Sequence, residues 1–170
     1  DAMRVLGELR SNAAGDSDLL YYVSHLYLQV DDRKTAEEVL EEVLRVDPNH
    51  SSAANDLGYF MAEENRDLDR AMELVTIAVR EEPDNQAFLD SYGWVLYKRG
   101  RFEEAVDYLE RAIAQTVEPD PIVLDHLGDA YYRVGRVDDA LKKWTESNEA
   151  LARRMRGSPD HRKLQLQLQS

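Results

Sequence analysis

The sequence predicts an all-α solenoid in which about four helical hairpins stack on one another. Three observations predict it. Columns of residues recur every 34 or 35 positions, each repeat unit contains two apolar stripes of helical period, and the prolines fall only between or beyond those stripes. A hairpin of two short helices cannot bury its apolar stripes alone, so consecutive hairpins must stack. With 43% hydrophobic residues and only eight glycines among 170, the chain can bury such a core as one domain.

Five columns of residues carry the repeat. Three glycines lie 35 positions apart, four alanines follow at intervals of 35, 34 and 35, and a bulky residue stands four positions after each alanine. Further glycines and prolines repeat at the same spacing. The columns are Gly58, Gly93 and Gly128; Ala36, Ala71, Ala105 and Ala140; Leu40, Val75, Leu109 and Trp144; Gly100 and Gly135; and Pro48 and Pro83, with Pro119 near the next position.

Each unit is predicted to contain a first and a second helix. Apolar residues of the first helices recur at i, i+3 and i+7, which places them on one face. Mid-helix glycine costs about 1 kcal/mol relative to alanine, so three glycines at one register need a structural reason. We expect them to let each first helix approach its partner closely, with the alanine column at the matching contact. The first-helix stripes are Leu20, Val23 and Tyr27; Ala54, Leu57 and Met61; Leu89, Tyr92 and Leu96; and Leu124, Leu127 and Tyr131.

These columns resemble the tetratricopeptide repeat family. Segment 86–120 matches its pattern best, through Leu89, Tyr92, Gly93, Leu96, Gly100, Ala105, Leu109 and Ala112. Segment 121–157 matches nearly as well, segment 51–85 has one extra residue in its turn at 65–68, and segment 17–50 has Ser24 where glycine is expected. Residues 1–16 look like the second helix of an earlier repeat. The resemblance implies a right-handed α-α superhelix, truncated at the front. More narrowly, the chain resembles the C-terminal arrays of large bacterial repeat proteins.

The end of the chain departs from the repeat. The last second helix is predicted to begin near Val137 and to keep an apolar stripe as far as Met155, which makes it a long capping helix. Residues 158–170 form a basic tail in which apolar residues alternate with period two. A frayed end, a short strand and exchange of the tail between molecules all fit this pattern, so self-association through 158–170 stays open.

Composition excludes several functions. The net charge of −13 opposes binding to nucleic acid, although residues 141–170 carry +4 and residues 1–140 therefore −17. No apolar run is long enough to span a membrane. Without cysteine, a phosphate-binding loop or a nucleophile motif, we expect no catalysis and no cofactor. We also expect no metal site, because only Asp125 and Asp129 share a face and His126 between them points about 100° away; solvated side chains are favoured there.

The resemblance implies a concave groove lined by the first helices, which binds a peptide. Stacking brings the residues that the apolar stripe does not use into columns of carboxylates and aromatic rings. Such columns favour a basic or aromatic-rich segment, because rings attract cations and carboxylates pair with them. They exclude a clamp for an anionic chain end, since Asp90 and Asp125 would repel it. The predicted peptide-binding residues are Asn55, Tyr59, Asp90, Trp94, Tyr97, Asp125, Asp129 and Tyr132.

Two alternatives stay open. Tyr97 and Tyr132 can equally be half-buried spacers between repeats, although a tryptophan such as Trp94 is costly to leave wet without a purpose. The whole fragment can also be a structural spacer or a self-assembly module of a larger repeat protein, rather than a scaffold that binds a peptide.

Overall fold

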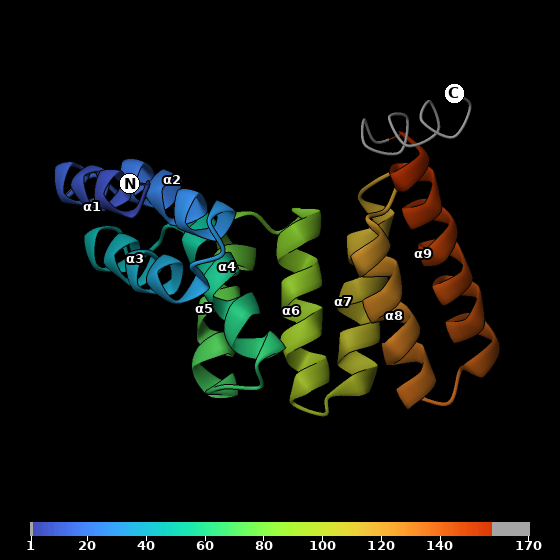
Figure 1. Cartoon of the computed structure of the whole chain (residues 1–170). Coiled ribbons are helices and arrows are strands. Elements are labelled where there is room, and N and C mark those ends of the chain that lie inside the picture. The colour runs from blue at the N-terminus through green and yellow to red at the C-terminus, as the bar shows by residue number, and fades with distance from the viewer. Residues whose placement is uncertain (1, 158–170) are drawn as a thin grey trace, which may run out of the picture.

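The computed structural model describes residues 2–157, and over this range it contains nine helices and no strand. The helices pair in chain order and stack in a single row, while their axes turn from α2 and α3 at one end toward α8 and α9 at the other (Figure 1). The predicted all-α superhelix is confirmed; the basic tail lies outside the described residues. The helices are α1 Ala2–Asn12, α2 Ser17–Gln29, α3 Arg33–Val46, α4 Ser51–Glu63, α5 Leu68–Glu81, α6 Gln86–Lys98, α7 Phe102–Ala114, α8 Pro121–Arg133 and α9 Val137–Gly157.

Each first helix ends in the same kind of turn. A residue with positive φ reverses the chain, and the N–H of the next residue donates to the carbonyl oxygen five positions before it, which closes the last helical turn. Glycine supplies this conformation without strain, and Asp and Asn are the other residues that tolerate it. The turn residues are Asp31, Asn65, Gly100 and Gly135, with φ of 61°, 54°, 77° and 82°, and the donors are Asp32, Arg66, Arg101 and Arg136.

The extra residue predicted at 65–68 is present in the turn between α4 and α5. Four residues separate these two helices, whereas three separate the helices of each other hairpin. The chain accommodates the insertion by placing a second residue, Asp67, in the left-handed region with φ of 35°. Asp67 also caps α5, because its carboxylate accepts the N–H of Arg70 at 3.3 Å.

The glycine column lies where each first helix meets the second helix of its own hairpin. A Cβ at Gly93 would stand 2.7 Å from Leu109 Cγ and 3.3 Å from the carbonyl oxygen of Ala105. The same addition at Gly58 would come within 3.1 Å of the Ala71 carbonyl oxygen. Helix backbones therefore touch through glycine on one side and alanine on the other, as predicted.

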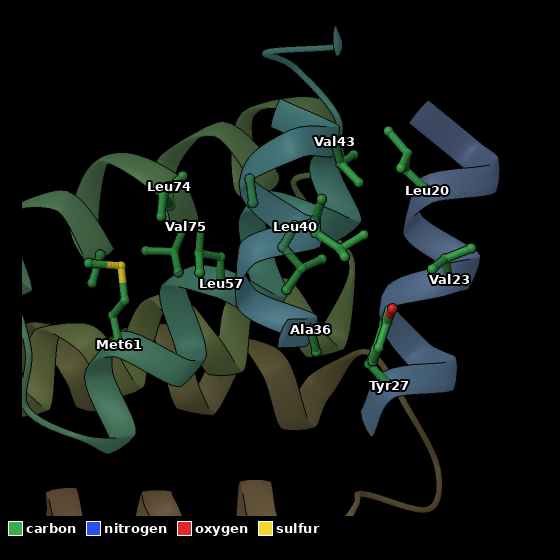
Figure 2. Close-up of a cluster of buried hydrophobic side chains, with 14 of the residues drawn as sticks. Leu20, Val23, Tyr27, Ala36, Leu40, Val43, Leu57, Met61, Leu74 and Val75 are labelled. Atoms are coloured by element: carbon green, nitrogen blue, oxygen red, sulfur yellow. The ribbon is translucent and has the colours of Figure 1, made fainter. Parts of the chain in front are cut away.

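The predicted stripes form the core. Figure 2 shows Leu20, Val23 and Tyr27 of α2 directed toward α3, and the side chains of α4 and α5 that continue the same apolar layer. The stripe of α9 differs from the prediction, since Trp144 is half-buried but Leu151 and Met155 are exposed. The reason is the length of α9: Ser147 already hydrogen-bonds the carbonyl oxygen of Pro121 at the start of α8, so the last turns extend beyond α8.

Replacing Gly93 by alanine tests the close approach. The new methyl group would press on Leu109 and on the Ala105 carbonyl, both in a filled core, so Gly93→Ala is expected to lower the free energy of unfolding by about 1–3 kcal/mol in urea titrations. Gly7→Ala in α1 is the matched control, because a Cβ there meets nothing within 4 Å. Helix propensity alone should make the control neutral or stabilising by up to about 1 kcal/mol. Equal effects of the two changes would contradict the close-packing explanation.

Candidate functional site

A pocket of about 360 Å³ opens between the N-terminal halves of α4, α6 and α8. Three of the predicted peptide-binding residues, Asn55, Tyr59 and Asp90, line it, and so do the aliphatic side chains of Ile122 and Val123. Successive first helices therefore come together where the resemblance placed a binding groove. The other predicted residues lie outside this pocket, in two further groups.

The first group is a stack of rings next to the pocket. The Trp94 indole lies 4.8 Å from the ring of Tyr97 and 3.9 Å from that of His126, with interplanar angles of 6° and 11°. Its Nε1–H donates to Glu63 Oε1 at 2.6 Å. His126 Nδ1 lies 3.0 Å from Asp90 Oδ1 and donates to it, since an ionised carboxylate can only accept. This pair and the stack tie α4, α6 and α8 together.

Two expectations about these residues are wrong. Trp94 was expected to face solvent, but it is only 7% exposed, because its ring stacks between repeats and its N–H is satisfied by Glu63. His126 was expected to be solvated, but it is 5% exposed and bonded to Asp90. The carboxylate of Asp90 is buried with it. The aromatic and acidic residues of α6 therefore contribute to packing between the repeats.

The second group faces α9. Trp144 Nε1–H donates to Asp129 Oδ1 at 3.1 Å, and the Trp144 ring lies 5.9 Å from that of Tyr132. Asp125 and Tyr132 are exposed, whereas Asp129 is half-buried. Burial raises the pKa of the Asp129 carboxyl and the neighbouring Asp125 carboxylate raises it further, while the Trp144 hydrogen bond opposes this shift. The eight predicted residues therefore fall into three groups: those that line the pocket, those of the ring stack, and Asp125, Asp129 and Tyr132.

Lysine and arginine side chains of this protein already lie over two of the predicted aromatic residues, Trp94 and Tyr97. Lys98 Nζ is 4.7 Å from the ring centre of Trp94. The guanidinium of Arg133 is 5.9 Å from the ring of Tyr97 and 3.9 Å from that of Phe102. A cation from a ligand would have to displace these groups or bind beside them. A cation of a ligand would consequently be attracted by the carboxylates more than by these rings.

Hydrogen bonds link successive first helices diagonally, and one step is missing. Tyr21 Oη donates to Asp56 Oδ2 at 3.0 Å between α2 and α4, and the equivalent step between α6 and α8 joins Asp90 to His126. By repeat register, the step between α4 and α6 would join Asn55 to Ser91. Asn55 is 8% exposed, yet its Oδ1 has no hydrogen-bond partner. The pocket lies at this interruption.

Sequence reasoning missed several residues of the pocket. Gln86, Ser91, Ile122 and Val123 line it together with the predicted residues, and Gln86 Nε2 is buried without a hydrogen-bond partner, like Asn55 Oδ1. The available signal was the column one position after the predicted Asn55, Asp90 and Asp125, since it contains Ser91 and His126. Its polar residues point to contacts across the repeat interface. The sequence at the start of α8 gave no signal that Ile122 and Val123 would line a pocket.

A substitution of His126 tests the buried pair. His126→Phe keeps a ring against Trp94 but removes the donor to Asp90, so the buried carboxylate loses its partner. The free energy of unfolding should fall by about 1–3 kcal/mol in urea titrations. Adding Asp90→Asn removes the stranded charge and should recover part of this loss. If the double variant is no more stable than His126→Phe alone, the stranded carboxylate is not the cause of the loss.

The raised pKa of Asp129 predicts a pH-dependent effect on stability. Between the unfolded-state pKa and the higher folded-state value, the folded protein binds more protons, so this carboxyl stabilises the fold as the pH falls through that window and destabilises it when ionised at neutral pH. Asp129→Asn keeps an oxygen for Trp144 without the charge. Its Tm should therefore exceed that of the parent at pH 7, and the difference should shrink in acid. Asp107→Asn, at an exposed position of α7, is the control and should show neither effect.

Comparisons with known proteins agree with the fold. The family model described as tetratricopeptide repeat matches residues 24–86, 62–121 and 93–153. A TPR repeat-containing protein of Pseudomonas aeruginosa is 36% identical over 114 residues, which cover 67% of this chain and 19% of the relative. The matched part of the chain thus spans about a fifth of that relative's length.

Solved structures with a similar fold include MamA proteins. MamA from Desulfovibrio magneticus RS-1 superposes with a TM-score of 0.71 at 21% identity, covering 91% of this chain and 85% of that one. A MamA structure from AMB-1 gives a TM-score of 0.68 at 24% identity, covering 86% of each chain. At these identities the likeness shows the shared fold. Together with the matches along the sequence, it shows that the chain belongs to the tetratricopeptide repeat family.

Proposed function

We propose that this chain holds a segment of another protein against the first-helix face, the surface that α2, α4, α6 and α8 present away from the second helices, and that the segment is basic or rich in aromatic residues. The tetratricopeptide fold generally mediates interactions between proteins, and its members are scaffolds rather than enzymes. The eight predicted residues all lie on these first helices, and so do most of the residues around the pocket.

The observation that carries the proposal is the pocket between α4, α6 and α8. Two buried amide atoms on its lining residues, Asn55 Oδ1 and Gln86 Nε2, have no hydrogen-bond partner. Leaving a buried polar atom unpaired costs about 1–3 kcal/mol, and such atoms in a folded protein require an explanation. A bound chain supplies donors and acceptors along its whole backbone. The pocket therefore supports a polar, chain-like ligand better than a purely apolar one.

The charge of the first helices supports a cationic ligand. Their sequences contain six acidic residues and two basic ones, an excess of four negative charges with histidine neutral. Asp90 is hydrogen-bonded to His126, and Asp129 accepts a hydrogen bond from Trp144. Asp125 is exposed, and no hydrogen bond or ion pair is seen for it among the described residues. A positively charged segment would be attracted to this face, mainly through its rate of association.

The aromatic part of the proposal rests on fewer exposed atoms. Trp94 is buried and its ring is covered, so it supports the shape of the face and offers little contact area. Tyr132 is 57% exposed and Tyr59 lines the pocket. Burial, together with the charges of Glu63 and Asp90, raises the pKa of Tyr59 to about 12, so its hydroxyl stays protonated at neutral pH. Among the predicted residues, these two tyrosines offer rings that a ligand can reach.

None of the helices between residues 2 and 157 combines the length and the apolar character needed to cross a bilayer. Self-association through residues 158–170 would use a segment outside the described part of the chain. The acidic first-helix face is a surface on which such a basic segment could compete with other ligands.

A charge-matched pair of peptides tests the proposed function. Two labelled peptides of equal length, alternating tyrosine with lysine in one and with glutamate in the other, are titrated with the protein and followed by fluorescence anisotropy. The lysine peptide should bind more tightly, and its affinity should fall with added salt. Asp125→Asn should weaken it about threefold, the size of one exposed ion pair.

The control for this test is Asp107→Asn, which removes the same charge from the second helix α7 and should leave binding unchanged. Equal affinity for the two peptides would overturn the basic character of the ligand. Equal effects of Asp125→Asn and Asp107→Asn would show that binding responds to net charge and not to the first-helix face.

A further inference from the structure

The pocket between α4, α6 and α8 occupies a gap in a regular pattern. At the equivalent positions of the neighbouring repeats, Tyr21 is bonded to Asp56 and Asp90 to His126. Between them, Asn55 and Ser91 both line the pocket, and Asn55 Oδ1 accepts no hydrogen bond from any described residue. The missing step leaves a buried, unpaired hydrogen-bond acceptor on a residue that lines the cavity. A ligand group can complete the step that the chain itself leaves open.

The orientation of the Asn55 amide is fixed by its other end. Asn55 Nδ2 donates to Asp56 Oδ1 at 3.3 Å, and a carboxylate can only accept, so the oxygen of the amide is the atom left unpaired. Gln86 contributes the complementary atom, a buried Nε2 with no acceptor. The occupant that satisfies both must therefore donate one hydrogen bond and accept another.

The rest of the pocket favours a flat apolar body. Ala87, Ile122 and Val123 supply aliphatic walls, and Tyr59 supplies an aromatic ring. A cavity of about 360 Å³ leaves room for a large side chain. Aromatic side chains bury large apolar areas, and with few rotatable bonds they lose little conformational entropy on binding.

We propose that this pocket receives a tyrosine side chain of the bound segment, with its hydroxyl donating to Asn55 Oδ1 and accepting from Gln86 Nε2. A phenol hydroxyl both donates and accepts, and its ring matches the apolar walls. This inference rests on the proposed function for the origin of the tyrosine, while the chemistry of the pocket stands on the geometry alone.

Other side chains fit the pocket less well. Phenylalanine fills the walls but leaves both amide atoms unpaired. The ammonium group of lysine can donate to Asn55 Oδ1, but it cannot accept a hydrogen bond from Gln86 Nε2. A carboxylate or a phosphorylated tyrosine has no donor for Asn55 and meets the Asp90 and Asp120 carboxylates that also line the pocket. Glutamine provides both hydrogen-bonding atoms, but its thin, flexible stem covers less of the apolar wall.

Substitution of one residue in the ligand tests the pocket. A further peptide is built from lysine and glycine with a single tyrosine at its centre. Three variants of this peptide carry phenylalanine, glutamine or phosphotyrosine at the central position. The tyrosine peptide should bind most tightly, and the change to phenylalanine should weaken it about tenfold, because two buried polar atoms then stay unpaired. Equal affinity of the tyrosine and phenylalanine peptides, or tighter binding of the glutamine or phosphotyrosine peptide, overturns the proposal.

Two variants locate the effect on the protein. Asn55→Leu and Gln86→Met each remove one unpaired atom, so each should reduce the preference for tyrosine over phenylalanine. Because an apolar group then replaces an unsatisfied polar one, Gln86→Met should not lower the Tm appreciably, which shows that its fold is intact. Asn55→Leu also loses the hydrogen bond to Asp56 Oδ1, so its Tm should fall, and its helical circular dichroism is compared with that of the parent. Gln29→Met, at an exposed position near the end of α2, is the matched control and should keep the full preference. Variants that retain the parent's preference contradict the assignment.

A small probe separates this inference from the proposed function. Titration with 4-methylphenol, and with toluene as the comparison, is followed by NMR on the side-chain amide resonances of Asn55 and Gln86. The phenol should shift both resonances more than toluene does, whether or not any peptide binds. Peptide binding without a phenol-specific shift would leave the proposed function standing and overturn the tyrosine pocket. A phenol-specific shift without peptide binding would support the chemistry of the pocket and overturn the proposed function.

Discussion

The arrangement of this protein depends on how closely each first helix approaches the second helix of its own hairpin. At Gly58, Gly93 and Gly128 there is no room for a Cβ, and at Gly128 an added Cβ would lie 2.5 Å from atoms of the Trp144 ring. Alanines of the second helices are fully buried at these contacts. Packed interiors leave few voids and transmit strain. The geometry of each hairpin therefore fixes the offset between consecutive first helices, that is, how far one is shifted along its axis relative to the next. The contacts between successive first helices follow from that offset.

The offset determines which side chains meet across the repeats. It brings a residue of one first helix beside the residue one position further along in the next, as in the pairs Tyr21 with Asp56 and Asp90 with His126. A buried hydrogen bond adds only about 1 kcal/mol in net terms, but losing one partner is costlier, so such pairs fix the register of the repeats more than they add stability. The step at Asn55 lacks this restraint, and the cavity lies there.

The repeat period predicted the fold in detail, because each helix is specified by local residues. The glycine and alanine columns, the extra residue before α5 and the start of α9 at Val137 all follow from sequence spacing. The site was predictable only in part. Asn55, Tyr59 and Asp90 do line one pocket, but a single repeat's periodicity does not encode the offset between repeats. For that reason the burial of Trp94 and the contact of His126 with Asp90 could not be derived from the sequence.

The two unpaired amide atoms of the pocket have a thermodynamic consequence for binding. A hydrogen bond gained by a buried polar atom contributes about 0.5–1.5 kcal/mol in net terms. A ligand group that pairs with both atoms therefore gains affinity, and every 1.4 kcal/mol corresponds to about a factor of ten. Exposed carboxylates such as Asp125 contribute less, since a solvent-exposed ion pair is worth about 1 kcal/mol at most and is screened by salt. The acidic face therefore governs how a segment approaches, and the unpaired amides at Asn55 and Gln86 govern which side chain it must carry.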